Sequence, residues 1–291
     1  TLAHGRAGLS VPFGDLRGAE RANPDEPGCS DWLAASRRRA LLADVGIGTI
    51  DQALLGVLPT KHACLRLFGL SSKILIVDEV HEMGDPYLEE LLAALLHAHA
   101  ALGGSAILLT ATLPLRLRAR LVGAFETGAG RMSVAPTDAA YPALTVAGGA
   151  ARTDLPRQTG PRGPVRVERL SGPEAAVDLL AERAGQGAAC VWVRNAVDEA
   201  ISAVRALRAK GVPADLLHAR FALSDRKRHE AAALGRFGKA GTGRAGRVLV
   251  ATQVVESSLD LDFDVMVSDL APMAALIQRA GRLWRHMDLR P

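Results

Sequence analysis

The chain has 291 residues, enough for about two domains of ordinary size. Hydrophobic residues make up 48% and charged residues 23%, which excludes a disordered tail, a collagen-like repeat and a disulfide-rich miniprotein. No stretch reaches the roughly 18 consecutive apolar residues that a membrane span requires, so we expect no membrane association.

The basic charge comes almost entirely from arginine. Lys and Arg total 35, of which five are lysine and 30 arginine, against 31 acidic residues and a net charge of +4. The planar guanidinium group of arginine suits phosphate, although arginine-rich composition is also typical of GC-rich genomes. This modest excess permits nucleic-acid binding without requiring it. The three cysteines lie far apart without metal-ligand spacing, which favours a reducing, cytoplasmic compartment.

The first half of the chain predicts an α/β series. Residues 49–58 carry apolar side chains at helical spacing, with Thr49 as the expected N-cap. Residues 73–77 (KILIV) form a continuous apolar run, which predicts a strand buried on both faces. A helix over 86–102 and a strand over 106–109 follow, and an arginine-rich helix is expected at 115–125.

The second half predicts another such series. Residues 128–164 are rich in Gly, Pro and Thr and lack periodicity, so we expect two domains, 1–155 and 156–291. Five strands and four helices are expected to alternate in the second domain, at 164–169, 173–184, 188–193, 196–210, 213–217, 224–237, 247–251, 264–268 and 273–284. Alternating strands and helices imply mainly parallel sheets with flanking helices, so the predicted fold class is α/β.

The strongest functional signal is ILIVDEVH, residues 74–81. Asp78 and Glu79 follow a buried strand, and ligands of parallel sheets bind outside the carboxyl ends of strands. Two carboxylates at such a place are costly unless they meet a cation or transfer a proton. Asp78 suits a Mg²⁺ held through water, and Glu79 suits the orientation of an attacking water.

Two further motifs follow other predicted strands. Thr110 and Thr112, in LLTATLP, come after the next strand, where two hydroxyl groups could bridge to the carboxylate pair and sense its occupancy. In LIQRAGRLWRH, Arg279, Arg282 and Arg285 recur every three residues, which on a helix places them close to one face. Such a row could present guanidinium groups to a triphosphate; the alternative is a solvated basic helix face.

In this order, the strings DEVH, TAT, ATQVVESSLD and QRAGRLWR resemble motifs II, III, V and VI of superfamily 2 helicases. Longer strings, from GTIDQALLGVLPTKHACLRLFGLSSKILIVDEVH through LLHARFALSDRKRHE to QVVESSLDLDFDVMVSDLAP, are similar to the CRISPR-associated helicase-nuclease of type I interference systems. The resemblance runs from LAHGRAGL at residues 2–9 to residue 286 and is weakest across 128–164. It implies two RecA-like domains, the first truncated at its N-terminus.

The resemblance also implies a site for ATP and Mg²⁺. Asp78 and Glu79 would serve the metal and the hydrolytic water, and Arg282 and Arg285 would be the arginine fingers. Other residues would couple the nucleotide to DNA movement, support the fingers or face the nucleotide cleft: His81, Thr110, Thr112, Gln278, Arg279, Glu256 and Asp260.

The DNA contacts implied by the resemblance lie in both domains. They are Gly48, Thr49, His218, Ala219, Arg220, Thr252 and Gln253. Contacts to the DNA backbone carry no sequence information, which suits a motor that pulls any strand. The implied activity is ATP-dependent 3′-to-5′ translocation on single-stranded DNA, which drives degradation of target DNA in the bacterial cytoplasm. An RNA-guided CRISPR surveillance complex would be the partner.

Such a motor needs a P-loop, G-x-x-x-x-G-K-S/T, and the 291 residues contain none. Residues 241–246 (GTGRAG) match the dinucleotide fingerprint but precede a strand, so we interpret them as a loop. We expect the P-loop of the family to lie upstream of LAHGRAGL, with the nuclease and C-terminal domains also outside the chain. The chain alone is therefore expected to hydrolyse little or no ATP.

Three alternatives remain open. Another superfamily 2 motor, such as a restriction translocase, would share the short motifs but lack the longer strings. A non-catalytic DNA-binding or regulatory remnant would act through a partner. A truncated gene, a split protein or a pseudogene would be distinguished by the flanking nucleotide sequence.

Overall fold

The computed structural model describes residues 2–3, 31–34, 36, 39–71, 73–149, 152–155, 163–256 and 259–287. Most of the LAHGRAGL string lies outside the described residues. The chain divides into two units, Thr1–Arg157 and Gln158–Pro291, and the division lies within the Gly- and Pro-rich stretch where the sequence predicts a boundary.

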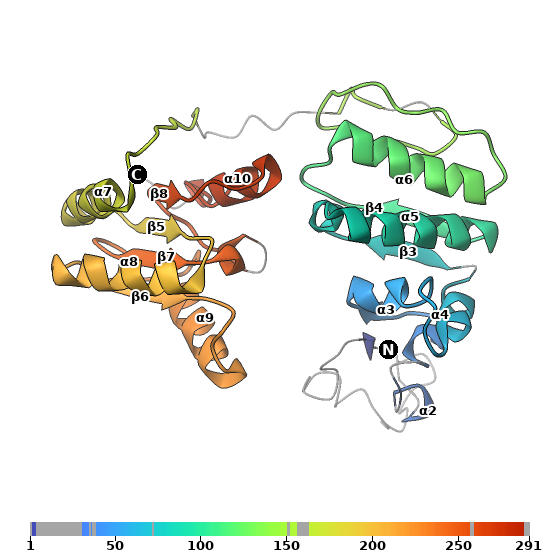
Figure 1. Ribbon diagram of the computed structural model, residues 1–291, viewed down its shortest axis with the longest axis horizontal. Helices are drawn as coiled ribbons and strands as arrows, with labels where there is room; N and C mark the ends of the chain where they lie inside the picture. The colour runs from blue at the N-terminus through green and yellow to red at the C-terminus, as the bar shows by residue number, and fades with distance from the viewer. Residues whose placement is uncertain are drawn as a thin grey trace. The chain divides into compact units, whose positions relative to one another are not determined.

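The first unit combines two parallel strand pairs with helices (Figure 1). β3 pairs with β4 in parallel, from Ile74 opposite Ser105 to Val77 opposite Leu108. The elements are β1 (Leu2–Ala3), α2 (Asp31–Ala34), η2 (Ala40–Leu42), β2 (Ile47–Gly48), α3 (Ile50–Leu54), α4 (Ala63–Leu70), β3 (Ile74–Val77), η3 (Val80–Met83), α5 (Pro86–Ala101), β4 (Ser105–Leu108) and α6 (Leu115–Gly128).

Helix α5 is the central packing element of the first unit. It begins at an N-cap, Asp85, whose carboxylate accepts a hydrogen bond from the Tyr87 N–H, with Pro86 in the first turn. Its buried leucines pack against α6 and the inner face of β3 and β4. This core holds the carboxyl ends of the two strands, which carry the DEVH and TAT motifs, next to each other.

The prediction that strand 73–77 is buried on both faces is wrong. Ile74 and Ile76 are 65% and 61% exposed, and Ile107 on β4 is 46% exposed, whereas Val77 is buried. Successive side chains of a strand point to opposite faces, and the described residues cover only one face of this pair. An apolar run therefore indicated a strand correctly but could not show how many of its faces are covered.

The second unit contains a four-stranded parallel sheet in the order β6-β7-β5-β8. Its elements are α7 (Pro173–Gly185), β5 (Cys190–Val193), α8 (Val197–Ala209), β6 (Ala214–Leu217), α9 (Leu223–Phe237), β7 (Val248–Ala251), η4 (Gln253–Val255), β8 (Val265–Ser268) and α10 (Met273–Ala280). The strand predicted at 164–169 is wrong, since residues 163–170 form no helix or strand.

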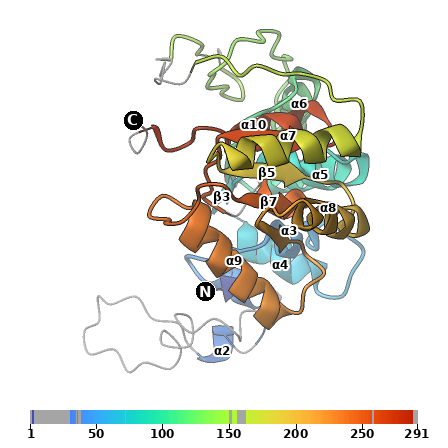
Figure 2. The same ribbon diagram turned by 90° about the vertical axis from the view of Figure 1, so that its left-hand side faces the viewer.

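Two apolar clusters sandwich this sheet. α7 and α8 pack on one face around Trp192, and α9 packs on the other around Phe237 and Phe263. Figure 2 shows these three helices around the strands of the sheet. Both central strands, β5 and β7, are buried along their whole length, as continuous apolar runs predict. Burial also raises the pKa of the Cys190 thiol to about 11, so this cysteine is an inert part of the core.

Candidate functional site

The carboxylates of the DEVH motif lie directly beyond β3. The Glu79 N–H donates to Asp78 Oδ1 at 2.9 Å, and Glu79 adopts a left-handed backbone conformation with φ of 55°. A non-glycine residue in that conformation is strained, a feature that clusters at functional sites. The Glu79 side chain is 49% exposed and Asp78 is exposed as well, so both carboxylates are open to a ligand.

This loop is fixed to the end of β4. The N–H of Val80, which is buried, donates to the Leu109 carbonyl at 3.1 Å. Thr110 therefore follows its strand beside the carboxylate loop. The Thr110 hydroxyl donates to the Thr112 carbonyl at 2.7 Å, and the Thr112 N–H lies 3.3 Å from Thr110 Oγ1. The two threonines thus form one local turn.

His81 connects the threonine turn to the carboxylates. Its Nδ1 lies 3.2 Å from Thr110 Oγ1 and 3.3 Å from Glu79 Oε2, and its Nε2 lies 3.6 Å from Glu82 Oε1. The same ring nitrogen therefore lies within reach of both the Thr110 hydroxyl and the Glu79 carboxylate. One of the two threonines, Thr110, is thus linked to one of the two carboxylates, Glu79, through the His81 imidazole, whose side chain is 8% exposed.

An exposed carboxylate at a strand end is a donor that suits Mg²⁺, which keeps most of its water ligands. Among the described residues no group of three or more His, Cys, Asp or Glu side chains could hold a metal. Asp78 is an exposed carboxylate that could hold such an ion through water.

The arginines of the second unit do not share one helix face, so that prediction is wrong. α10 ends at Ala280 rather than at residue 284, and Gly281 begins a turn. Beyond it, the Phe263 N–H donates to the Arg282 carbonyl and the Trp284 N–H donates to the Phe263 carbonyl, both at 3.0 Å. These bridges to a buried segment replace the last helical turn.

Arg279 is the hub of this region and is only 2% exposed. Its Nε donates to Glu256 Oε1 at 2.7 Å, its Nη1 donates to Ser268 Oγ and the Asp269 carbonyl, and its Nη2 donates to Asn195 Oδ1 at 3.2 Å. It therefore ties the ATQVVE segment to the residues at the carboxyl ends of β5 and β8.

We expect Arg279→Ala to destabilise the second unit by about 3–5 kcal/mol, because it leaves the Glu256 carboxylate, which is only 13% exposed, without its ion-pair partner. Urea unfolding measured by circular dichroism gives the change. The control is Arg166→Ala, which removes an exposed arginine paired with Glu168 and should cost less than about 1 kcal/mol. Equal losses for the two variants would show that Arg279 is not a structural hub.

The other two arginines differ in accessibility. Arg282 is buried, and its Nη2 donates to the Glu256 carbonyl at 2.6 Å. Arg285 is 40% exposed at its side chain; its Nε bonds to Asp260, and its N–H donates to Asp262 Oδ1 at 2.8 Å. Of these two side chains, that of Arg285 is the more accessible to a ligand.

The residues with implied DNA contacts are of two kinds. Some are held by backbone geometry: a Cβ at Gly48 would collide with the Ala3 carbonyl, and Thr49 has N-cap geometry without a side-chain cap bond. The others differ in how far their side chains are exposed to solvent. Those of Arg220 and Gln253 are exposed, so they are accessible to a DNA strand.

The neighbouring His218 and Thr252 are buried. The His218 ring stacks on Phe221 at 3.9 Å, and burial lowers the pKa of this histidine below its ordinary value. Because His218 is buried and Arg220 is exposed, Arg220 is the accessible basic side chain of this pair.

The sequence motifs missed Asn195. It follows β5, and its side chain donates to the Leu270 carbonyl at 2.8 Å while accepting from Arg279. Its N–H donates to Asp269, which also accepts from Arg194 at 2.9 Å. The rule that polar residues at strand ends form sites, which identified Asp78, would have identified Asn195 as well.

Known proteins resemble the chain throughout. The family model described as CRISPR-associated nuclease/helicase Cas3, C-terminal, matches residues 186–288. The CRISPR-associated endonuclease/helicase Cas3 of Escherichia coli is 39% identical over 305 residues, which cover 98% of this chain and 34% of the relative. The CRISPR-associated endonuclease/helicase Cas3 of Thermus thermophilus is 37% identical over 344 residues, which cover 100% of this chain and 36% of the relative.

Solved structures agree. T. fusca Cas3 superposes with a TM-score of 0.84 at 36% identity, covering 99% of this chain and 35% of that one. T. fusca Cas3 with ATP superposes with a TM-score of 0.80 at 38% identity, and the match covers 92% of this chain and 34% of that one. A chain of a solved CRISPR RNA-guided surveillance complex, pre-nicking, superposes with a TM-score of 0.73 at 38% identity. The match covers 87% of this chain and 33% of that one.

The fold expectation is also confirmed. S. cerevisiae Dbp5, at 16% identity and a TM-score of 0.50, shares the fold alone, so the architecture is RecA-like α/β. The chain spans about a third of the length of the curated relatives. The chain thus belongs to the Cas3 family of CRISPR-associated helicase-nucleases.

Proposed function

We propose that the two units act on one ATP molecule to drive 3′-to-5′ movement along single-stranded DNA. The observation that carries this proposal is the constellation beyond β3 and β4, in which the exposed Glu79 contacts His81 and His81 contacts Thr110. T. fusca Cas3 has been solved with ATP, which supports a nucleotide site in the family.

In this proposal, Asp78 would hold Mg²⁺ through water, and Glu79 orients the attacking water and accepts its proton. Mg²⁺, when bound, neutralises charge that develops on the phosphates. His81 relays the state of Glu79 to the Thr110 turn. Arg285, supported by Arg282, stabilises charge on the transferred phosphoryl group. The Glu256 carbonyl holds Arg282, Asp260 pairs with Arg285, and Arg279 fixes the Glu256 carboxylate. Gln278 is proposed to support the same group.

We also propose that Thr112, Gly48, Thr49, Arg220, Thr252 and Gln253 belong to the path between nucleotide and DNA. Target DNA would be delivered by an RNA-guided surveillance complex, as the complex containing a similar chain supports, in the bacterial cytoplasm. Within the described residues, no helix could cross a membrane. The 291 residues lack G-x-x-x-x-G-K-S/T, so hydrolysis requires a phosphate-binding loop that they do not supply.

Translocation tests the proposal. The full-length protein that carries these residues should displace streptavidin from the 5′ end of a biotinylated single strand, with ATP, much faster than from the 3′ end. Displacement from the 3′ end alone would show 5′-to-3′ movement and contradict the proposed direction. DNA-independent hydrolysis without displacement would favour a non-translocating enzyme.

A further inference from the structure

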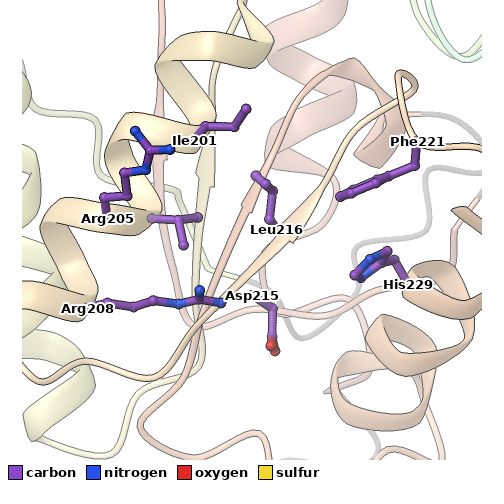
Figure 3. A pocket seen from close by; sticks show the side chains of 8 residues that line it. Ile201, Arg205, Arg208, Asp215, Leu216, Phe221 and His229 are labelled. Carbon is purple, nitrogen blue, oxygen red and sulfur yellow. The ribbon is translucent and has the colours of Figure 1, made fainter. Parts of the chain in front are cut away.

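A depression of about 290 Å³ lies at one edge of the sheet of the second unit. β6 is the terminal strand of that sheet, so one of its backbone edges pairs with no strand among the described residues. Figure 3 shows the side chains that surround the depression. We define the edge groove by Ile201, Arg205 and Arg208 of α8, Leu216 of β6, and Phe221 with His229 opposite.

The floor of the edge groove is apolar. Val204 is buried beneath it, and Ile201, Leu216 and Phe221 are only half-buried, so parts of these side chains face water. Covering such surface is favourable in proportion to the apolar area removed from water. The floor therefore offers apolar surface that an apolar side chain of a partner would cover.

The aromatic rings of the groove argue against a nucleobase as this occupant. Phe221 stacks on His218 at 3.9 Å and 9°, and on His229 at 4.3 Å and 23°. Two near-parallel neighbours at these distances must cover opposite faces of the Phe221 ring. Binding of single-stranded nucleic acid relies on free aromatic faces, and Phe221 offers none.

The rim of the edge groove is positive. Arg205 is exposed, and no side chain of the described residues forms an ion pair or hydrogen bond with it. Asp215, the carboxylate that lines the groove, accepts from Arg236 Nη1 at 2.7 Å, so its charge is compensated. The groove thus presents unbalanced arginine charge, which is complementary to an acidic partner.

The strand edge offers backbone groups as well. The Pro213 carbonyl accepts from Val248 of β7, and the Leu217 carbonyl accepts from Thr252, directly after β7, so the carbonyls of the residues between them alternate toward the free edge. Arg208 Nε and Nη2 both donate to the carbonyl of Ala214, at 3.1 and 2.8 Å, which blocks that position. The N–H and carbonyl of Leu216 remain for an extended chain.

We propose that the edge groove binds an extended acidic segment of a partner protein. One large apolar side chain of the segment enters between Ile201 and Phe221, an adjacent carboxylate pairs with Arg205, and its backbone bonds to Leu216. The edge groove borders the segment with proposed DNA contacts, since Phe221 stacks on His218 and follows Arg220, but Arg205 has no part in the proposed motor, and the docking site goes beyond the proposed function.

The test uses a fluorescein-labelled dodecapeptide with one Phe flanked by Asp and Glu, titrated with the full-length protein in an anisotropy assay. We expect binding tighter than about 1 mM and a loss of at least about tenfold for Arg205→Glu. Replacing the peptide's Phe by Ala, or its acidic residues by Lys, should abolish binding. Arg183→Glu, which changes an exposed arginine of α7, is the matched control and should have no effect.

Several results would overturn the proposal. One is no binding of the acidic peptide at about 1 mM; another is an equal loss for Arg205→Glu and Arg183→Glu. Competition by an oligo-dT strand whose own binding is lost on Arg205→Glu would assign the groove to nucleic acid. DNA-stimulated hydrolysis should be unchanged in Arg205→Glu, so a failure here is distinguishable from a failure of the motor proposal.

Discussion

Replacing Glu79 by Gln in the full-length protein should slow DNA-stimulated ATP hydrolysis by about 10²–10⁴-fold. The substitution keeps the size of the side chain and the strained backbone of Glu79 while removing the carboxylate that accepts the proton of water. ATP binding should be unchanged, because the proposal assigns Glu79 to the attacking water rather than to the phosphates. Steady-state phosphate release and binding of a fluorescent ATP analogue separate the two effects.

Glu82→Gln is the matched control for this prediction. Glu82 also faces His81, on the other ring nitrogen at 3.6 Å, and it is exposed to a similar extent. The control therefore removes one negative charge next to His81 while keeping Glu79, the proposed base. If both variants lose activity equally, the effect arises from His81 and not from water activation by Glu79.

Arg285→Ala should slow hydrolysis by about 10³–10⁵-fold in the same protein, the range measured for arginine fingers. Its side chain is 40% exposed, and its ion pair with Asp260 is open to solvent. Losing such a pair costs at most about 1 kcal/mol, so the fold should be retained. Single-turnover hydrolysis and thermal unfolding of the same samples measure the two quantities.

Arg228→Ala is the control for Arg285. Arg228 is an exposed arginine of the same unit, paired with Asp225 on α9 at 2.9 Å. Its removal takes away a comparable charge and ion pair from a helix outside the proposed site. Comparable rate losses in both variants would indicate a general effect of positive charge and contradict a finger role for Arg285. Arg282 is less suitable for this test because it is buried.

The sequence predicted the parts of the fold that local pattern determines. Continuous apolar runs indicated β5 and β7, whose residues are buried on both faces, and polar residues after such runs indicated the positions of Asp78 and Thr110. Both features are recorded in the local sequence, because the interior of a strand in a parallel sheet is apolar and polar residues follow where the strand ends.

Other features depended on contacts that no local pattern records. The run at 73–77 does not show whether anything covers Ile74 and Ile76, and the periodicity of Arg279, Arg282 and Arg285 continues past the end of α10. That helix ends because the chain bonds to Phe263, a partner about 20 residues earlier in sequence. Tertiary bonding, rather than helix propensity, decides the positions of the last two arginines.

The most direct test of the central claim, that both units act on one nucleotide, is a double-mutant cycle on hydrolysis. Single-turnover rates are measured for the full-length protein, for Glu79→Gln, for Arg285→Ala and for the double variant. Residues that act together on one reaction show strongly non-additive losses. The claim predicts that the double variant is about as slow as the slower single variant. Losses that multiply across the two substitutions would contradict it.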